Sequence, residues 1–488
     1  MTTLVWLQRE LRLTHLPALQ SALQGELDKS ATQNNPKQSV ILAYFHDPEQ
    51  VIGEANTLWL AHALQKLQAQ LAQQGGQLWV IEGAFATELT NLINTYNIKS
   101  MHYSFQVGAP FQGMQQQALE VCQQAQVALK PFFSETLMPP GEILNQQAKP
   151  YVVFTPFYKT LISKAAMMEP LEPETGDVRV LNVPCANPTW LSLPASLQAI
   201  QAQAWANKLV TQESVGAQSA WQTLDAFIDS AMADYDNDRN FPILQATSGL
   251  SAHLHFGEIN PRAIYFYIQS KIENRQLSAA QATPWLRQLV WAEFAKTLLW
   301  HFPETQFKPF QAKFNTMQWQ HSASLISLWQ TGQTGIPIID AGMRELWQTG
   351  TMHNRVRMLV ASFLTKNLNQ SWRVGQQWFD NTLLDADPAN NAMGWQWVAG
   401  CGVDAAPYYR LFNPVVQSQK FDGEGAYLRH WLPALKNLSN KAIHAPWEYA
   451  EECALKNVVL GKTYPKPLVD LKQSRTEHLE RVAQLKTT

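Results

Sequence analysis

The fold of this chain is decided by TGIPIIDAGMRELWQTGTMHNRVRM at residues 334–358 and LLDADPANNAMGWQWVAG at residues 383–400. The first segment places Arg355 and Arg357 within one helical turn, and the second contains Asp385 near its start. An arginine of one segment can therefore form a directional, two-point link with a carboxylate of the other. The same pair also fits an ordinary structural salt bridge, so these residues alone leave the function open.

Helical patterns extend on both sides of these segments. From about Trp221 to the C-terminus, apolar residues recur at helical spacing and strand patterns are sparse. The clearest predicted helices span residues 220–232, 260–272, 285–300, 338–349 and 354–367. This pattern predicts a large all-helical domain over residues 216–488.

The first 135 residues follow a different pattern, in which short β-type runs alternate with helical ones. The predicted strands are residues 4–7, 40–45, 78–81 and 101–105. Thr57 is expected to cap a helix that Gly75 and Gly76 then end. Such alternation predicts a Rossmann-like α/β domain, a parallel sheet covered by helices, over residues 1–135. Frequent prolines mark residues 136–215 as a connector between the two domains.

The composition excludes several classes of protein. Of the 488 residues, 46% are hydrophobic and 16% charged, as in a globular protein, and no apolar run reaches the length of a membrane helix. Without a signal peptide, the chain is expected in the cytoplasm. The formal net charge of −2 argues against a globally basic nucleic-acid binder but allows a local basic patch. Cys122, Cys185, Cys401 and Cys453 form no CxxC pair, so no metal site is expected.

The two segments quoted above, at residues 334–358 and 383–400, resemble the FAD-binding signature of the DNA photolyase/cryptochrome family, in its class I bacterial form. The resemblance covers nearly the whole chain, because further segments match in order: LVWLQRELRL at 4–13, YVVFTPFYK at 151–159 and ATSGLSAHLHFGEINPR at 246–262. It implies FAD held in the helical domain. It also implies a monomeric, light-driven carbon–carbon lyase that repairs cyclobutane pyrimidine dimers in damaged DNA.

The resemblance also implies the cofactor contacts. They are Tyr235, Thr247, Ser248, Leu250, Ser251, Trp285, Arg357, Asp385, Asp387 and Asn391. Short hydroxyls and backbone N–H groups near a helix start suit the pyrophosphate. Asn391 matches the position that faces flavin N5. Plant cryptochromes typically carry Asp there, so Asn391 favours repair over signalling.

Electron transfer and substrate binding are implied in the same way. Trp395, Trp372 and Trp319 match the family's electron chain, and with Asn391 they form the predicted catalytic set. The predicted substrate contacts are Arg239, Gln288, Trp291, Asn354, Arg355, Met358, Trp397 and Arg410. Trp291 and Trp397 would flank a dimer extruded from the duplex, since the flavin cannot approach a lesion within the base stack.

Several positions depart from the family pattern. Gln288 stands where dimer photolyases usually have Glu, and Ala292 replaces the Arg of the family's WREF motif. Gln8 replaces an expected Arg, and no acidic residue lies between Met101 and Leu119, so the folate-type antenna site looks altered. Two alternatives stay open: a cryptochrome-like photoreceptor without repair activity, and a (6-4) photolyase. The second requires histidines at the positions of Asn354 and Met358.

Overall fold

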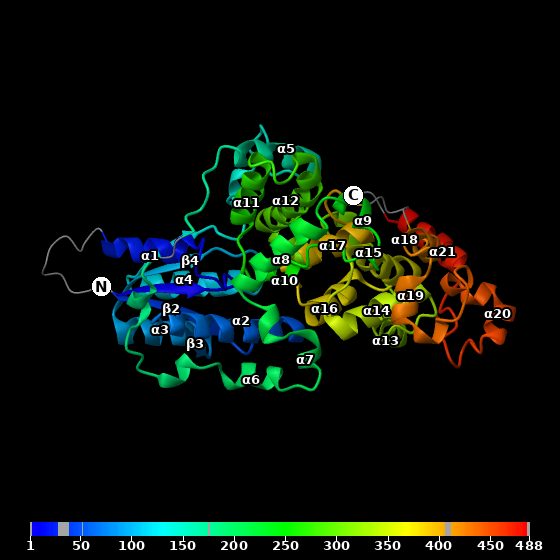
Figure 1. The fold of residues 1–488 in the computed structure, drawn as a ribbon, viewed down its shortest axis with the longest axis horizontal. Helices are drawn as coiled ribbons and strands as arrows, with labels where there is room; N and C mark the ends of the chain where they lie inside the picture. The colour runs from blue at the N-terminus through cyan, green and yellow to red at the C-terminus, as the bar shows by residue number, and fades with distance from the viewer. Residues whose placement is uncertain (1, 28–38, 51, 174–175, 406–410, 486–488) are drawn as a thin grey trace, which may run out of the picture. The chain divides into compact units, whose positions relative to one another are not determined.

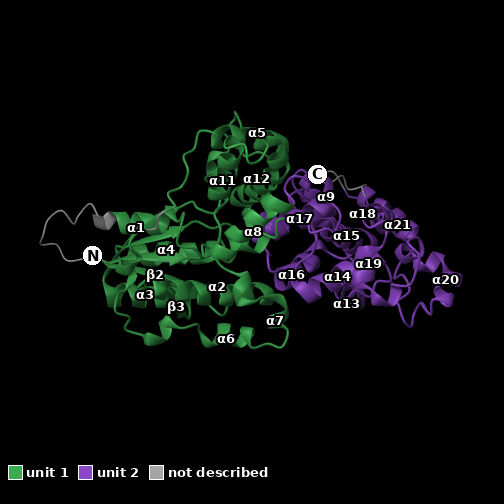
Figure 2. Cartoon of the chain, viewed as in Figure 1, with its two compact units in different colours: residues 1–230, 248–303 green, residues 231–247, 304–488 purple. Residues whose placement is uncertain are grey.

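The computed structural model describes residues 2–27, 39–50, 52–173, 176–405 and 411–485 of the chain. The chain divides into two compact units (Figure 2). Unit 1 comprises residues 1–230 and 248–303, and unit 2 comprises residues 231–247 and 304–488. Within the described ranges, no helix is both long and apolar enough to span a membrane.

Unit 1 is built on a five-stranded parallel sheet with the strand order β3-β2-β1-β4-β5 (Figure 1). Its strands are β1 (Thr2–Leu7), β2 (Ser39–His46), β3 (Trp79–Glu82), β4 (Ile98–Ser104) and β5 (Ala128–Phe132). The helices between them are α1 (Pro17–Leu27), α2 (Glu54–Gln73), α3 (Phe85–Tyr96) and α4 (Phe111–Gln124). The central strand β1 reads as a continuous apolar run because it is buried on both faces.

This sheet confirms the four predicted strands and adds β5, which the pattern did not indicate. Strand β5 is an edge strand that is largely exposed, and it contains Lys130 and Pro131 instead of alternating apolar residues. The prediction that Thr57 caps a helix was wrong. Helix α2 begins at Glu54, because Gly53, with a φ of 89°, turns the chain into the helix one turn earlier.

The rest of unit 1 is helical. Its α-helices are α5 (Phe154–Ala165), α6 (Ala195–Gln201), α7 (Ala206–Leu209), α8 (Ala217–Ser230), α10 (Ser251–His255), α11 (Pro261–Glu273) and α12 (Ala279–His301). Its 3₁₀ turns are η1 (Pro140–Glu142), η2 (Val178–Leu181), η3 (Pro188–Leu191) and η4 (Gln212–Ser214). Helix α12 begins earlier than predicted because Ser278 and Gln281 form a capping box upstream of Pro284.

The regular elements of unit 2, within the described residues, are helices and helical turns. Its α-helices are α9 (Tyr235–Asp238), α13 (Ala323–Gln330), α14 (Pro337–Thr349), α15 (Asn354–Ser362), α16 (Trp372–Thr382), α17 (Pro388–Ala399), α18 (Pro414–Phe421), α19 (Ala426–Trp431), α20 (Ala450–Leu455) and α21 (Leu471–Ala483). A π-helical turn (Phe363–Asn367) continues α15. The 3₁₀ turns are η5 (Pro303–Gln306, which begins at the last residue of unit 1), η6 (Ala312–Thr316), η8 (Pro433–Leu435), η9 (Ala442–His444) and η10 (Pro446–Glu448). The fold class is thus the predicted one, a parallel α/β domain followed by a largely helical part.

A buried polar network fastens residues 248–303 to the carboxyl edge of the sheet in unit 1. Arg12 forms an ion pair with Glu135 at 2.8 Å, and both side chains are at most 5% exposed. The Arg12 guanidinium also donates to the Gly257 carbonyl, and Lys296 donates to the Glu135 carbonyl at 2.6 Å. Gly257 has a φ of +58°, and a Cβ there would lie 2.7 Å from the Glu135 carboxylate. The approach therefore requires glycine.

We expect Glu135→Gln to lower the free energy of unfolding by on the order of 3 kcal/mol, because it leaves the buried Arg12 charge without its anion. The shift in the urea midpoint measures this loss. Asp177→Asn is the matched control, because Asp177 pairs with Arg179 in solvent, and it should leave the midpoint nearly unchanged. Equal shifts in the two variants would contradict the structural importance of the buried pair.

Candidate functional site

The predicted site residues belong to both units, and each set is described within its own unit. Unit 1 contains Ser248, Leu250, Ser251, Trp285, Gln288 and Trp291. Unit 2 contains Tyr235, Arg239, Thr247, Trp319, Asn354, Arg355, Arg357, Met358, Trp372, Asp385, Asp387, Asn391, Trp395 and Trp397. The predicted contact Arg410 lies outside the described residues.

The expected pairing of Arg357 with Asp385 is present in unit 2. One terminal nitrogen of Arg357 donates to both carboxylate oxygens of Asp385, at 3.0 and 2.9 Å, and its Nε donates to the Met352 carbonyl at 2.7 Å. The Asp385 side chain is 8% exposed and that of Arg357 is 26% exposed. The pair therefore joins α15 to the loop before α17 in a partly desolvated setting, where an ion pair is directional.

Asp387 has a local structural role next to this pair. Its carboxylate accepts from the N–H groups of Ala389 and Asn390, at 3.0 and 2.9 Å, and so caps α17, while Pro388 occupies the first helical position. Capping sets the direction in which α17 leaves the loop. Asn391 and Trp395 are one turn apart on that helix, so the cap determines where both side chains lie.

The amide of Asn391 is held in one orientation by helix α16. Its Nδ2 donates to a carboxylate oxygen of Asp380 at 2.6 Å and to the Gln376 carbonyl at 3.1 Å. Both partners are acceptors, so only the NH₂ end of the amide fits there. The Oδ1 atom has no hydrogen-bond partner among the described residues and is the end left for a ligand. Asp380 and Gln376 were not predicted from the sequence, because no motif connects them to Asn391.

The carboxyl group of Asp380 is an unusual neighbour for this amide. Burial, with a smaller contribution from the negative charge of Asp387, raises its pKa from 3.8 to about 6, although the hydrogen bond from Asn391 and the charge of Arg373 oppose the shift. The folded protein thus holds a carboxyl group that titrates not far below neutral pH. Strongly perturbed carboxyl groups of this kind gather at functional sites.

Trp395 lies in a tightly packed aromatic environment in unit 2. Its ring contacts Phe379 and Trp329, with ring centroids 5.0 and 6.2 Å apart. A Cβ at Gly375 would lie 2.0 Å from the Trp395 ring, so α16 approaches α17 closely only because residue 375 is glycine. The indole N–H of Trp395 is buried and has no hydrogen-bond partner in the described part of the chain.

The other two tryptophans of the predicted electron chain follow along the chain from this contact. Trp372 begins helix α16, one turn before Gly375, and is 3% exposed. A parallel bridge between Gln320 and Gln370 brings the neighbourhood of Trp319 to the start of α16. Trp319 is partly exposed. Trp395 and Trp372 are thus both buried and Trp319 is partly exposed, and the electron chain itself remains a prediction.

The predicted substrate residues of unit 2 gather around the first turn of α15. Arg355 donates to Asn240 Oδ1 at 2.5 Å and lies over the Phe421 ring, and its other terminal nitrogen is 4.0 Å from the Met358 sulfur. His353 caps this helix by accepting from the Arg355 N–H. Burial, together with the nearby charges of Arg355 and Arg357, lowers the pKa of His353 to about 4, so its ring stays neutral and able to accept.

The remaining predicted residues of unit 2 are less constrained. Asn354 is exposed at the start of α15, and Trp397 packs partly against the core of the unit. Arg239 lies over the Tyr235 ring, and Tyr235 is buried. Thr247 is exposed.

In unit 1, the predicted lesion wall Trp291 is stacked on Phe154. The two rings are nearly parallel, at an interplanar angle of 4°, and their centroids are 3.5 Å apart. Gln288, one turn earlier on α12, donates its amide to the Pro284 carbonyl of the same helix at 3.2 Å. Trp285 is buried against Phe227. The role of Phe154 could not be read from YVVFTPFYK, because stacking across elements carries no sequence signal.

The predicted pyrophosphate contacts of unit 1 form a turn ahead of the short helix α10. Ser248 accepts weakly from the Leu250 N–H at 3.4 Å, and Gly249 has a φ of +68°. Leu250 is buried, whereas Ser251 is exposed at the helix start. The turn therefore presents short hydroxyl groups, which is chemistry that suits a phosphate.

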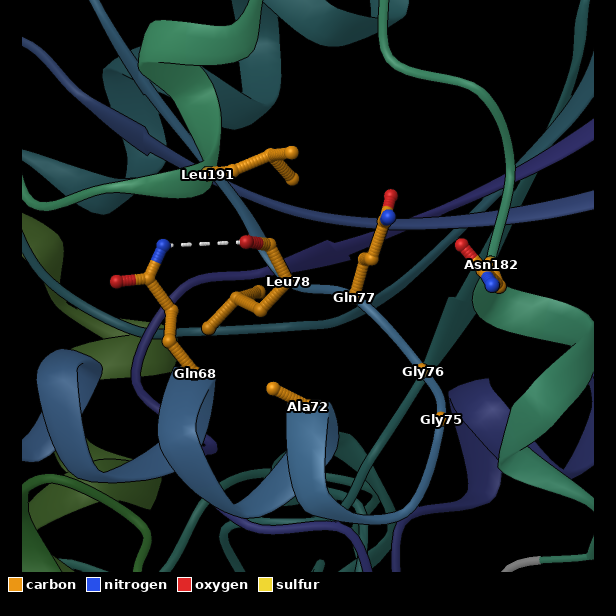
Figure 3. A pocket seen from close by; sticks show the side chains of 8 residues that line it. All are labelled: Gln68, Ala72, Gly75, Gly76, Gln77, Leu78, Asn182 and Leu191. Carbon is orange, nitrogen blue, oxygen red and sulfur yellow. Dashed lines mark hydrogen bonds between the residues drawn. The ribbon is translucent and has the colours of Figure 1, made fainter.

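Two features of unit 1 lie apart from these residues. Gln8, at the altered antenna position, is buried and donates to the Ser104 carbonyl at 2.8 Å. A cavity of about 310 Å³ lies where α2 ends and β3 begins (Figure 3). Its lining consists of Gln68, Ala72, Gly75, Gly76, Gln77, Leu78, Asn182 and Leu191. That lining has no acid, base or nucleophile and includes none of the predicted residues.

The donor set of unit 2 fits a flavin. An isoalloxazine ring needs a polar atom of fixed orientation near N5 and flat apolar surroundings. Asn391 offers the oriented amide, and Trp395 offers a buried indole with an unpartnered N–H. The ion pair between Arg357 and Asp385 holds the loop that leads into α17, the helix on which these two residues lie.

Comparisons with known proteins agree with this fit. The chain matches two family profiles, the FAD binding domain of DNA photolyase over residues 285–484 and DNA photolyase over residues 3–175. It is 36% identical to the deoxyribodipyrimidine photo-lyase of Agrobacterium fabrum, over 99% of this chain and 98% of that protein. An identity of this size over the full length of both chains indicates a common family and not only a common fold.

Two solved structures are similar to this chain over almost their whole length. A bacterial class III photolyase from Agrobacterium tumefaciens has a TM-score of 0.85 and 34% identity, covering 100% of this chain and 98% of the other. A cryptochrome from Synechocystis has a TM-score of 0.86 and 28% identity, covering 98% of each chain. A photolyase and a cryptochrome therefore share the fold of this protein.

We expect Asp380→Asn to stabilise the protein above pH 6 and to have little effect near pH 4. The folded pKa of Asp380 lies above its unfolded value, so ionisation opposes folding as the pH rises through about 6. The gain at pH 8 should be on the order of 1–2 kcal/mol, allowing for partial solvent screening. Thermal unfolding of wild type and variant across this pH range measures it. Asp229→Asn, which changes an exposed carboxylate, is the control, and a gain independent of pH would contradict the expectation.

Proposed function

The chain belongs to the DNA photolyase/cryptochrome family, and on this basis we propose that it is a deoxyribodipyrimidine photo-lyase that repairs cyclobutane pyrimidine dimers in DNA. The observation that carries the proposal is the fixed amide of Asn391, in a chain 36% identical to a protein of that name. Because the class III photolyase is similar over the whole chain, we also propose the class III form in place of the class I form that the motifs resemble.

Bound FAD would supply the light-absorbing electron donor. Around it, Asn391 would hold its amide oxygen towards the ring, because both of its amide hydrogens are engaged by α16. Arg357 and Asp385 would keep α15 and α17 in register, and Ser248, Ser251 and Thr247 would contribute hydroxyl groups to the pyrophosphate. Trp395, Trp372 and Trp319 would return electrons to the cofactor from the protein surface.

The substrate side would bind an extruded dimer. Trp291 has one face covered by Phe154, so its other face is the one able to stack on a flat lesion. Trp397 of unit 2 is the second predicted lesion contact. The guanidinium of Arg355, held by Asn240 and Phe421, would present its remaining donors to the DNA. Such contacts position a strand through its phosphates without reading its sequence.

A cryptochrome-like photoreceptor is the second candidate, and one specific observation favours it. Gln288 stands where a dimer photolyase is expected to carry Glu, and its amide bonds back to its own helix at Pro284. A site without this carboxylate loses a charged partner for the lesion. The similarity to the Synechocystis cryptochrome is compatible with such a protein.

The deciding assay uses the purified protein with reduced flavin and an oligonucleotide that contains one defined dimer. Illumination should restore the thymines with multiple turnovers, whereas the dark reaction and the oxidised protein should restore none. A protein that holds flavin and photoreduces normally, yet neither binds nor repairs the dimer, would be the photoreceptor instead.

Gln288→Glu should raise the repair rate, by up to about tenfold, because it adds the charged hydrogen-bonding group that dimer photolyases use at this position. The single-turnover repair rate under constant light measures the effect. Gln276→Glu, which adds the same charge at an exposed position of unit 1, should leave the rate unchanged. An unchanged rate in Gln288→Glu would show that the missing carboxylate does not limit repair.

A further inference from the structure

A cluster of one cation and three aromatic rings lies on α5 and α12 of unit 1. We call it the Arg287 cluster, and it consists of Phe154, Tyr158, Arg287 and Trp291. The Cζ of Arg287 lies 5.0 Å from the centre of the Phe154 ring and 5.1 Å from that of Tyr158. Phe154 also stacks on Trp291 at 3.5 Å. The cluster therefore connects a guanidinium to the predicted lesion wall through one shared ring.

The rings hold the Arg287 guanidinium without consuming its hydrogen-bond donors. A cation–π contact is an attraction to the π-system of the ring and needs no hydrogen-bond acceptor, so the five N–H groups of the guanidinium remain able to donate. Within the described residues, no carboxylate or carbonyl pairs with Arg287, and its side chain is partly exposed. Because Arg287 has no hydrogen-bond or ion-pair partner in the part of the chain that the structure describes, its N–H donors are available to an anion from solution.

The position of Arg287 on α12 places it beside the predicted lesion. Arg287 and Trp291 are four residues apart, so they lie on the same face of the helix. Val152 and Val153, which precede Phe154, are 41% and 46% exposed, so the surface next to the cluster is open to solvent.

The sequence also lacks a cation where the family pattern has one. Ala292 occupies the arginine position of WREF, immediately after Trp291. A DNA-binding surface that lost this charge would lose one phosphate contact, and each such contact contributes to affinity through counterion release. Arg287 supplies a charge on the other side of Trp291, one turn earlier on the same helix.

We propose that Arg287, held by the rings of Phe154 and Tyr158, contacts a phosphate of the damaged strand and replaces the arginine missing at position 292. This inference rests on the proposed repair function. It makes Arg287 a binding residue that fixes the strand next to Trp291. Phe154 is then a positioning residue for both the guanidinium and the indole.

The test measures dark binding of an oligonucleotide with one defined dimer over a series of salt concentrations. Arg287→Gln should weaken binding about tenfold at low salt. It should also reduce the slope of log K against log salt by about 1, the loss of one phosphate contact. Arg287→Lys, which keeps the charge, should retain the wild-type slope. Lys271→Gln is the matched control, because Lys271 forms a cation–π contact with Tyr267 on α11. It should change neither quantity.

The outcomes separate the two proposals. A wild-type protein that does not prefer dimer-containing over undamaged DNA would overturn the repair function itself. A wild-type preference with an unchanged slope in Arg287→Gln would overturn only the phosphate contact. Equal loss of slope in Arg287→Lys and Arg287→Gln would show that packing, and not charge, is what the side chain provides. Thermal unfolding and flavin content of each variant confirm that the comparison is between folded proteins.

Discussion

The ion pair between Arg357 and Asp385 is the constraint on which the candidate site depends. It connects α15 to the loop before α17, and its partial desolvation makes the link directional. The loop passes directly into the Asp387 cap, which fixes the start of α17. Asn391 and Trp395 follow on that helix, so their positions derive from a single charge pair and a single cap. A site built this way tolerates little change in its backbone.

The surroundings of Asn391 show that the site is not optimised for stability. Asp380 is a carboxyl group whose burial opposes its ionisation, and its best partner is a neutral amide. A structural position of this kind would favour an apolar or neutral residue, because the charge of Arg373 only partly offsets the cost of burying the carboxylate. Retaining a carboxylate there is understandable if the orientation of the Asn391 amide matters more than the stability lost. Functional sites commonly break local rules in this way.

Aromatic residues act in two distinct ways in this protein. Trp395 packs against the rings of Phe379 and Trp329 and against the backbone at Gly375. Its indole is buried, and among the described residues its N–H has no hydrogen-bond partner. Around Trp291, the ring of Phe154 covers only one face and leaves the indole at a surface. The first environment suits a residue that exchanges electrons with a buried partner. The second suits a residue that stacks on a group arriving from solution.

The sequence by itself determined the order of the α/β and helical parts and four of the five strands, since hydrophobic periodicity is a local signal. The pairing of Arg357 with Asp385 was expected from the family resemblance, because the charges alone leave the partners open. The sequence pattern missed β5, an edge strand that contains Pro131, and it placed the start of α2 at Thr57 instead of Glu54. Only the tertiary structure brought Asp380 to Asn391, Phe154 to Trp291 and Arg287 to its rings. These contacts join residues on different helices, and a side chain's neighbours across a helix interface depend on packing distances that no spacing along the chain encodes.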